Sequence, residues 1–277
     1  MRINNFASGF IKQLFMVVVA AFMLFPILWS LLTAFKPREL VLRYPPVFFT
    51  RDFTLDNFQY VYNNSNVPRM LFNSLSYSLI ATLISVSLAA LAAYVLSRYK
   101  FKGSNAITLA ILCPMLIPGI TNLVPLFAVY GRLGWVNSVH GLILLYLPSL
   151  LPLPIIILRN YISNIPFELE EAALIDGCAR IQLIFRIVLP ILSPGVLAVG
   201  LINFVLVWND FMITLIFANT VERRTITLGL FGIMGIGTIH RGIVNATAII
   251  SLFPVVVLFL AFRKRFIDSM LEGAIKG

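Results

Sequence analysis

The segment LFNSLSYSLIATLISVSLAALAAYVLS, residues 71–97, contains no charged side chain. A helix rises 1.5 Å per residue, so about 20 apolar residues cross a hydrocarbon core roughly 30 Å thick. This segment is therefore predicted to form a transmembrane helix. Its small and hydroxylated residues, among them Ser78, Ser85 and Ala89, favour close approach to another helix and hydrogen bonds across the contact. We interpret them as a packing face, and no catalytic serine is needed to explain them.

Other apolar segments of comparable length lie near residues 14–35, 106–130, 140–158, 191–217 and 243–262. All 21 Lys and Arg residues fall outside the six predicted spans, and Asp210 is the one acidic residue inside a span. Because charge is costly at the bilayer centre, this distribution supports the assignment. No polar linker divides the chain, so residues 1–277 are predicted to form a single all-α membrane domain.

Hydrophobic residues make up 60% of the chain and charged residues 12%, whereas a soluble domain has about 45–50% and 25%. The net charge of +10 comes from short clusters between the spans. Such clusters anchor helix ends to anionic headgroups and do not form a nucleic-acid-binding surface. Six spans place both termini on one side, which has the larger share of Lys and Arg, and this predicts cytoplasmic termini. The two cysteines do not suggest a disulfide framework, and the first apolar segment is too long for a cleavable signal.

Helix breakers interrupt the third and fourth spans: Pro114, Pro118, Gly119, Asn122, Pro125, Pro148, Pro152 and Pro154. Proline lacks a backbone N–H and clashes with the preceding turn. In lipid, the carbonyls that it frees need partners in neighbouring helices or in a water-lined cavity. These helices are therefore predicted to pack in a bundle, some of them beside a pathway. Kinks that serve packing alone are an equally open interpretation.

The predicted cytoplasmic loop 159–190 contains a charged helical sequence, IPFELEEAALIDG, at residues 165–177. Pro166 suits the first position of a helix, with Ser163 or Asn164 as a cap. The glutamates that follow lie in the first turns, where they complement the helix dipole. Gly177 is expected to end the helix in the left-handed conformation.

This helix is predicted to dock on a protein partner. Leu169, Ala172 and Ala173 share one side by their spacing, and the glutamates flank them. Alanine permits close approach, and glutamate can meet basic residues of a partner. A second helical stretch, Ala179 to Leu189, leads back to the membrane. The alternative, a helix resting on lipid, is disfavoured because the inner leaflet is anionic and attracts Lys and Arg.

Glu171-Ala172-Ala173, then Gly177 after three residues and Ile187-Val188-Leu189-Pro190 after nine more, resembles the EAA loop of ATP-binding-cassette (ABC) importer permeases. Other segments that resemble these permeases are Phe35-Lys36-Pro37, Tyr44-Pro45-Pro46, Phe53 to Phe58, Leu71 to Leu75, Ala92 to Tyr94, Phe101 to Gly103, Trp208 to Phe211 and Glu272 to Gly277. The resemblance covers nearly the whole chain and is to the carbohydrate permeases of the maltose-transporter type.

This resemblance implies a six-helix type I ABC importer transmembrane domain whose coupling helix, residues 168–176, docks on an ATPase subunit. The residues implied in this coupling are Glu168, Glu170, Glu171, Ala172, Ala173, Asp176 and Gly177. Glu171 is expected to form a salt bridge with the ATPase, and Gly177 to set the turn. ATP and magnesium are expected in the partners, because the chain has no Gly-x4-Gly-Lys-Ser/Thr phosphate loop. The chain itself is expected to bind no cofactor and no metal, and to be no enzyme.

The implied partners are a homologous second permease, which would form a heterodimer with this chain, two ATPase subunits, and an extracytoplasmic sugar-binding protein. The implied location is the bacterial inner membrane. The external stretch 218–242 matches in position the loop that enters the binding protein's sugar cleft, and its residues implied in contact are Glu222, Arg223, Arg224, Gly235 and Gly237. Its glycines are expected to permit a tight, mobile excursion. An ordinary external connector is the alternative, and the tail 266–277 is expected by analogy to reach the ATPase interface.

Four residues are candidates for the substrate path: Asn203, Trp208, Asn209 and Asp210. An ionisable residue inside a membrane is a functional hypothesis by default. The carboxyl group of Asp210 could bind sugar hydroxyls, or it could hydrogen-bond within the bundle, and the second role is favoured because buried acids are commonly paired. The resembling permeases often have glutamate at this position.

Two other function classes fit the sequence less well than sugar import driven by ATP hydrolysis in partner subunits. An ion-coupled secondary transporter or channel usually has an internal repeat and several intramembrane charges, and neither is present in the sequence. An intramembrane enzyme needs a nucleophile or a metal cluster, whereas His140 and His240 are isolated and no catalytic motif occurs.

Overall fold

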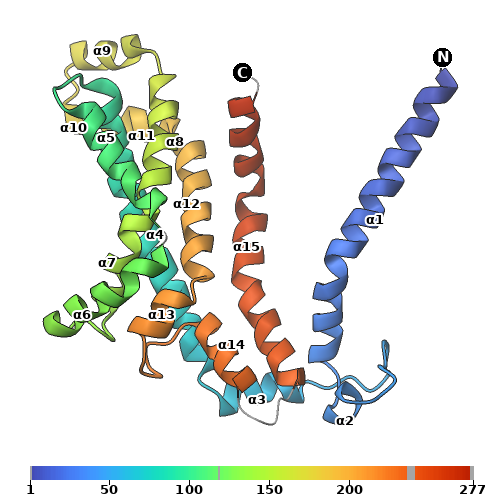
Figure 1. Ribbon diagram of the computed structural model, residues 1–277. Helices are drawn as coiled ribbons and strands as arrows, with labels where there is room; N and C mark the ends of the chain where they lie inside the picture. The colour runs from blue at the N-terminus through green and yellow to red at the C-terminus, as the bar shows by residue number, and fades with distance from the viewer. Residues whose placement is uncertain (1, 118, 236–240, 275–277) are drawn as a thin grey trace. The chain divides into compact units, whose positions relative to one another are not determined.

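The computed structural model describes residues 2–117, 119–235 and 241–274 (Figure 1). These residues are helical wherever they have regular structure, and no strand occurs among them. They form two compact units. Unit 1 consists of Met1–Pro68 and Gly229–Phe253, and unit 2 of Arg69–Leu228 and Pro254–Gly277. The single domain that the sequence predicts stays a prediction.

Unit 1 is built around α1, Arg2–Ala34, and the segment that follows it. The helices α2, Arg38–Val41, and α3, Asp56–Asn64, also belong to it. The side chain of Asn57 ties α3 to the end of α1, because its Nδ2 donates to the carbonyls of Ala34 and Lys36, each at 2.9 Å. The Lys36 ammonium donates to the Val47 carbonyl at 2.5 Å, and burial lowers its pKa.

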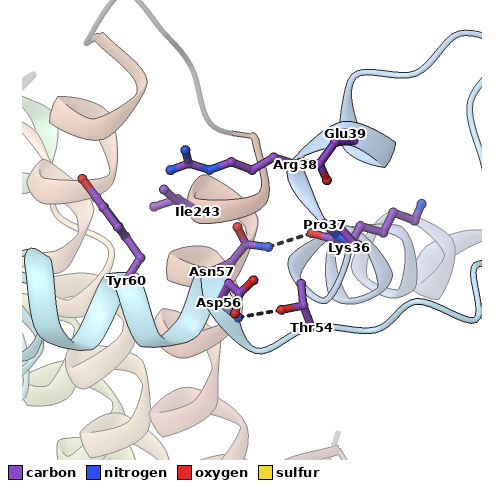
Figure 2. A pocket seen from close by; sticks show the side chains of 9 residues that line it. All are labelled: Lys36, Pro37, Arg38, Glu39, Thr54, Asp56, Asn57, Tyr60 and Ile243. Atoms are coloured by element: carbon purple, nitrogen blue, oxygen red, sulfur yellow. Dashed lines mark hydrogen bonds between the residues drawn. The ribbon is translucent and has the colours of Figure 1, made fainter.

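A cleft of about 280 Å³ opens in unit 1 beside Asn57 (Figure 2). It is lined by residues of α2, of α3 and of the segments just before each of them, together with Ile243. In Figure 2 the guanidinium of Arg38 extends toward Ile243, while the ammonium of Lys36 points away. A Cβ at Gly242 would lie 2.7 Å from the Asn57 amide, so a larger residue there would displace that side chain from its hydrogen bonds.

Unit 2 contains the remaining helices, and α4, Val67–Arg98, is its long central element. The others are α5 (Ser104–Leu112), η1 (Cys113–Leu116), η2 (Gly119–Asn122), α6 (Leu123–Leu133), α7 (Val139–Leu150), α8 (Pro152–Ser163), α9 (Phe167–Ile175), α10 (Arg180–Leu183), η3 (Ile184–Val188), α11 (Leu189–Ile191), α12 (Ser193–Trp208) and α13 (Met212–Phe217). Both units include residues of α14 (Ile226–Gly235) and α15 (Arg241–Ala274), and the first two residues of α4 belong to unit 1.

Among the described residues, three helices are long and apolar enough to cross a membrane: Ile11–Ala34, Val67–Arg98 and Arg241–Lys264. Three bent pairs of helices raise the number of spans to as many as six. They are Ser104–Leu116 with Gly119–Leu133, Val139–Leu150 with Pro152–Ser163, and Arg180–Ile191 with Ser193–Trp208. The last two pairs bend by 52° and 76°. The predicted span 191–217 therefore differs from the structure, since α12 ends at Trp208 and α13 begins at Met212.

Two apolar clusters form the interior of unit 2. The first joins α4 to α8, α10 and α12 through Ala93, Leu158, Leu183 and Val199, all buried. The second joins α4 to α7 and α13 through residues such as Tyr77, Leu142 and Phe217. Alanine on α4 allows the close approach that the sequence predicts for this span.

One proline-freed carbonyl in the fourth span has a side-chain partner on another helix. Pro154 has no N–H for the Leu150 carbonyl, which would accept from that position in a regular helix. Instead the Nδ2 of Asn203, a buried residue of α12, donates to Leu150 at 3.0 Å and to the Ser85 hydroxyl at 2.9 Å. Of the two kinds of partner that the sequence analysis allows, this carbonyl has the first, a side chain of a neighbouring helix.

Replacing Asn203 by alanine is expected to destabilise the protein by about 1–2 kcal/mol, because the Leu150 carbonyl then lacks a donor. Thermal unfolding of the detergent-solubilised protein measures this. The matched control is Asn209→Ala, at an exposed position just beyond α12. When Pro154→Ala is added to Asn203→Ala, residue 154 gains a backbone N–H that can donate to the Leu150 carbonyl. The double variant should therefore recover part of the lost stability. Equal melting temperatures for the two asparagine variants would contradict the assignment.

Candidate functional site

The helix α9 lies at the end of unit 2 at which α4 ends (Figure 1). Pro166 immediately precedes the helix with extended backbone (ψ 134°). The caps predicted from sequence are wrong: Ser163 Oγ donates to the Arg159 carbonyl and Asn164 Nδ2 to the Asn160 carbonyl. Both side chains satisfy the last turn of α8, so neither is available to α9.

Gly177 ends α9 as the sequence predicts. Its φ is +83°, in the left-handed region that favours glycine. The N–H of Cys178 donates back across it to the Ala173 carbonyl at 3.0 Å, and that of Gly177 to the Leu174 carbonyl at 3.1 Å. The turn is thus closed by main-chain hydrogen bonds of the kind that end helices at glycine.

The two sides of α9 differ in burial. Glu170 is 3% exposed, and Ala173, one turn later, packs against the first apolar cluster. Of the three residues that the sequence groups on one face, Leu169 and Ala172 are exposed and Ala173 is partly buried. The inward face is set by Glu170, whose carboxylate has partners on α4.

Glu170 is held by two side chains from the last turns of α4. The Nε of Arg98 donates to its Oε1 at 2.6 Å, and the hydroxyl of Tyr94 donates to its Oε2 at 2.9 Å. Arg98 also donates from Nη2 to the Ile165 carbonyl at 2.9 Å and lies 5.6 Å from the ring centroid of Phe167. Both carboxylate oxygens are therefore satisfied, and one arginine holds the chain on both sides of Pro166.

The segment after Gly177 contacts Tyr99, the residue that follows α4. The guanidinium of Arg180 donates to the Tyr99 hydroxyl at 2.7 Å and lies 5.8 Å from the ring centroid. The predicted helical stretch from Ala179 to Leu189 is present as α10, a π-helical turn at η3, and the start of α11. Two neighbouring segments of the loop 159–190, α9 and the start of α10, are thus both hydrogen-bonded to side chains of residues 94–99.

The outward side of α9 and the start of the next helix form what we call the α9 surface. It combines acidic side chains with large apolar ones: Glu168, Leu169, Glu171, Ala172, Leu174, Ile175, Asp176, Ile181 and Phe185. Ile175 is 85% exposed and Ile181 71%. Exposed apolar side chains on the same short segment as exposed carboxylates are typical of a surface that another protein covers.

The predicted external segment is fixed to the other end of α4. The Nδ2 of Asn73 donates to the carbonyls of Glu222 and Arg224 at 2.8 and 2.9 Å. The Tyr77 hydroxyl donates to the Arg223 carbonyl at 3.3 Å. The side chain of Glu222 is exposed, whereas those of the two arginines are partly covered.

The expected glycine-rich excursion is wrong for residues 226–235, which form the helix α14. Two of its residues, Ile226 and Leu228, are buried, and the N–H of Ile226 donates to the Ser74 hydroxyl at 2.8 Å. Burial of the apolar residues outweighs the roughly 1 kcal/mol cost of each glycine in a helix. Gly235 is the last residue of α14, and Gly237 lies outside the described residues, as does the end of the tail 266–277.

Asp210 occupies the break between α12 and α13. It accepts from the Tyr146 hydroxyl at 2.9 Å and from the N–H groups of Thr214 and Ile213 at 3.1 and 3.4 Å. Its own carbonyl accepts from the Thr227 hydroxyl at 2.7 Å. These contacts support the interpretation that Asp210 hydrogen-bonds within the bundle. Its carboxylate accepts from N–H groups in the first turn of α13 and joins that helix to α7 through Tyr146.

The other path candidates do not gather around Asp210 in one site. Trp208 is buried and stacks on Phe204, with ring centroids 5.6 Å apart. Asn203 is engaged by Leu150 and Ser85, as described above, and Asn209 is exposed. Within the described residues, no group of three or more His, Cys, Asp or Glu is placed to hold a metal ion.

Sequence reasoning missed the residues of α4 that hold these segments: Asn73, Ser74, Tyr77, Tyr94 and Arg98. A signal was present, because Asn73 and Tyr77, like Tyr94 and Arg98, are four residues apart and so share a helix face. They lie near the two ends of an otherwise apolar span, where polar groups can meet loops.

Comparisons with known proteins identify the family to which this architecture belongs. The family model described as "Binding-protein-dependent transport system inner membrane component" matches residues 85–270. The trehalose/maltose transport system permease protein MalG of Thermococcus litoralis is 34% identical over 264 residues, with 94% of each chain covered. The sulfoquinovosyl glycerol transport system permease protein SmoH of Agrobacterium fabrum is 32% identical, over 92% of this chain and 89% of that one.

A third relative is the diacetylchitobiose uptake system permease protein DasC of Streptomyces coelicolor, 28% identical over 94% of this chain and 95% of that one. Among solved structures, a chain of a bacterial ABC transporter involved in the import of alginate superposes with a TM-score of 0.85, at 18% identity, over 95% of this chain and 98% of that one. This likeness confirms the predicted fold, an all-α ABC importer transmembrane domain. The chain is a multi-pass membrane protein and belongs to the family of binding-protein-dependent transport system inner membrane components.

Proposed function

We propose that this chain is the permease subunit of an ABC importer for a carbohydrate. It moves its substrate inward by alternating access, and partner subunits hydrolyse the ATP that drives the change. The relatives are named for trehalose/maltose, sulfoquinovosyl glycerol and diacetylchitobiose, which are all glycosides. A glycoside is therefore the substrate class that we propose.

The observation that carries the proposal is the α9 surface. A short helix with exposed acids and exposed apolar side chains is held firmly against the unit by Glu170. In this proposal α9 is the coupling helix, and Glu168 and Glu171 meet basic residues of an ATPase subunit. Leu174 and Ile175 fill the apolar part of the same contact. Glu170 faces α4, so we assign it to holding α9 and not to the ATPase contact.

The assembly proposed has a homologous second permease, two ATPase subunits and an extracytoplasmic sugar-binding protein. ATP and magnesium are bound by the ATPase subunits, and this chain supplies no residue to that site. Both termini are placed on the cytoplasmic side together with α9, as the distribution of Lys and Arg favours.

The segment 222–224 is proposed to meet the binding protein on the external side. Its backbone is fixed to α4 by Asn73 and Tyr77, which supports a firm contact more than a mobile one. The exposed carboxylate of Glu222 is its most accessible charge. Of the path candidates, Asn209 is the one whose side chain is exposed, whereas Asp210 is proposed to hold α13.

Reconstitution of the whole complex in proteoliposomes tests the function. The expected result is glycoside uptake that requires ATP inside the vesicle and loaded binding protein outside, and that persists with a protonophore. Mass spectrometry of the ligand that co-purifies with the binding protein identifies the sugar. Uptake driven by a proton gradient alone, without ATP, would show that the chain is an ion-coupled transporter.

A further inference from the structure

The helix α4 has polar anchors near both of its ends. Tyr94 and Arg98 hold Glu170 of α9 at one end, and Asn73 and Tyr77 hold the 222–224 segment at the other. All of these residues lie in unit 2. The 25 steps along the chain from Asn73 to Arg98 correspond to about 37 Å along a helix axis. One continuous helix thus connects the coupling helix with the external segment.

The inner anchor is built for orientation more than for stability. The side chains of Arg98 and Glu170 are 10% and 4% exposed, and desolvating two charges offsets much of their attraction. An apolar pair of the same size would stabilise the fold about as well. What the ion pair adds is direction, because hydrogen bonds to both carboxylate oxygens fix the position and the rotation of α9 against α4.

Among the described residues, the side-chain hydrogen bonds that join α9 to another helix come from α4. The connection to α8 passes through Pro166, and the polar side chains just before it bond back to α8 itself. By contrast, Arg98 of α4 donates to Ile165 and Glu170. Tyr99, the residue after α4, accepts from Arg180. We therefore expect a displacement of α9 to reach α4 directly through these hydrogen bonds.

The contacts of Asn73, Ser74 and Tyr77 with the external segment also fix its orientation. Asn73 is buried, and its amide bridges two carbonyls of the external segment at 2.8 and 2.9 Å. The Ser74 hydroxyl accepts from Ile226 N at 2.8 Å. Because these contacts are to main chain, they hold the path of the segment and leave the Glu222 side chain free to meet a partner.

We propose that α4 is the lever that connects the two faces of the permease. Glu170 and Arg98 are positioning residues that make α9 and α4 move as one body, and Asn73 makes the external segment follow. Binding of loaded binding protein outside and closure of the ATPases inside are then coupled through this helix, and the coupling acts in both directions. This inference rests on the proposed function.

The test uses the reconstituted complex and compares ATP hydrolysis with and without sugar-loaded binding protein. Glu170→Gln cuts the inner anchor while keeping its shape, and Asn73→Ala cuts the outer one. Each is expected to lower the stimulation of hydrolysis and the uptake of sugar about tenfold, as when a buried polar group loses its partner. Basal hydrolysis is expected to stay at the wild-type level.

The controls separate coupling from folding. Lys100→Gln, two residues after α4, and Asn105→Ala, in the first turn of α5, change exposed residues and should behave as wild type. The charge swap Arg98→Glu with Glu170→Arg is expected to recover stimulation that either single swap loses. Arg98→Lys and Asn73→Gln keep a donor at each anchor and should retain part of the stimulation.

Cross-linking from position 172 to the ATPase, measured in parallel, separates this inference from the proposed function. If the cross-link forms and Glu170→Gln is stimulated like wild type, the lever is wrong and the proposed function stands. If wild type gives no cross-link to the ATPase, the proposed function fails. If every anchor variant, including the conservative ones, fails to assemble, the anchors serve the fold alone and the lever is wrong.

Discussion

Glu171→Lys is expected to lower ATP-driven sugar uptake about a hundredfold, because it places a cation against basic residues of the ATPase; like charges juxtaposed in an interface cost several kcal/mol. Glu171 is exposed on α9, whereas its neighbour Glu170 is buried. The change should therefore leave the permease folded and inserted. Uptake by proteoliposomes, normalised to inserted permease on an immunoblot, measures the effect.

The matched control is Asp52→Lys, an equal change of charge at an exposed residue of unit 1. It should transport as wild type. Glu171→Gln removes the attraction without adding repulsion, so it should fall between the two. Wild-type uptake by Glu171→Lys would show that this carboxylate does not meet the ATPase.

Gly177→Val is the second change with a large expected effect. At φ +83° a β-branched residue is strained by about 1–2 kcal/mol. A Cβ at this position would meet nothing within 4 Å, so the cost comes from the backbone alone. The end of α9 should shift, and uptake is expected to fall about tenfold, as measured in the same proteoliposome assay.

Gly177→Asn separates backbone strain from loss of glycine itself, because asparagine enters the left-handed region more readily. It should retain most of the uptake. Equal rates for the valine and asparagine variants would mean that the left-handed turn is not needed for coupling.

Much of the membrane topology follows from the sequence because charge is so costly in lipid. Excluding Lys and Arg from the spans locates α1, α4 and α15, and the prolines indicate the breaks in the third and fourth spans but not the bend near residue 192. What the sequence does not show is how a bend is satisfied. The pairing of Leu150 with Asn203 joins residues 53 apart, and no local pattern specifies it.

The site was predictable in its position and not in its orientation. The sequence locates α9 and its terminal glycine, since both depend on neighbouring residues. Three glutamates lie within four positions, and which of them faces inward depends on Tyr94 and Arg98, more than 70 residues away. The error at α14 has a different origin: glycine propensity is a local preference of about 1 kcal/mol, and burial of Ile226 overrides it.

The proposal that α9 is the element through which ATP hydrolysis acts is tested most directly by a photo-cross-linking amino acid placed at Ala172, which is exposed at the centre of the α9 surface. Native membranes are irradiated, and the cross-linked protein is identified by mass spectrometry. The predicted result is a single product with an ABC ATPase subunit, reduced by Glu171→Lys. Cross-linking to lipid alone would contradict the account, because it would mean that α9 rests on the membrane and not on an ATPase.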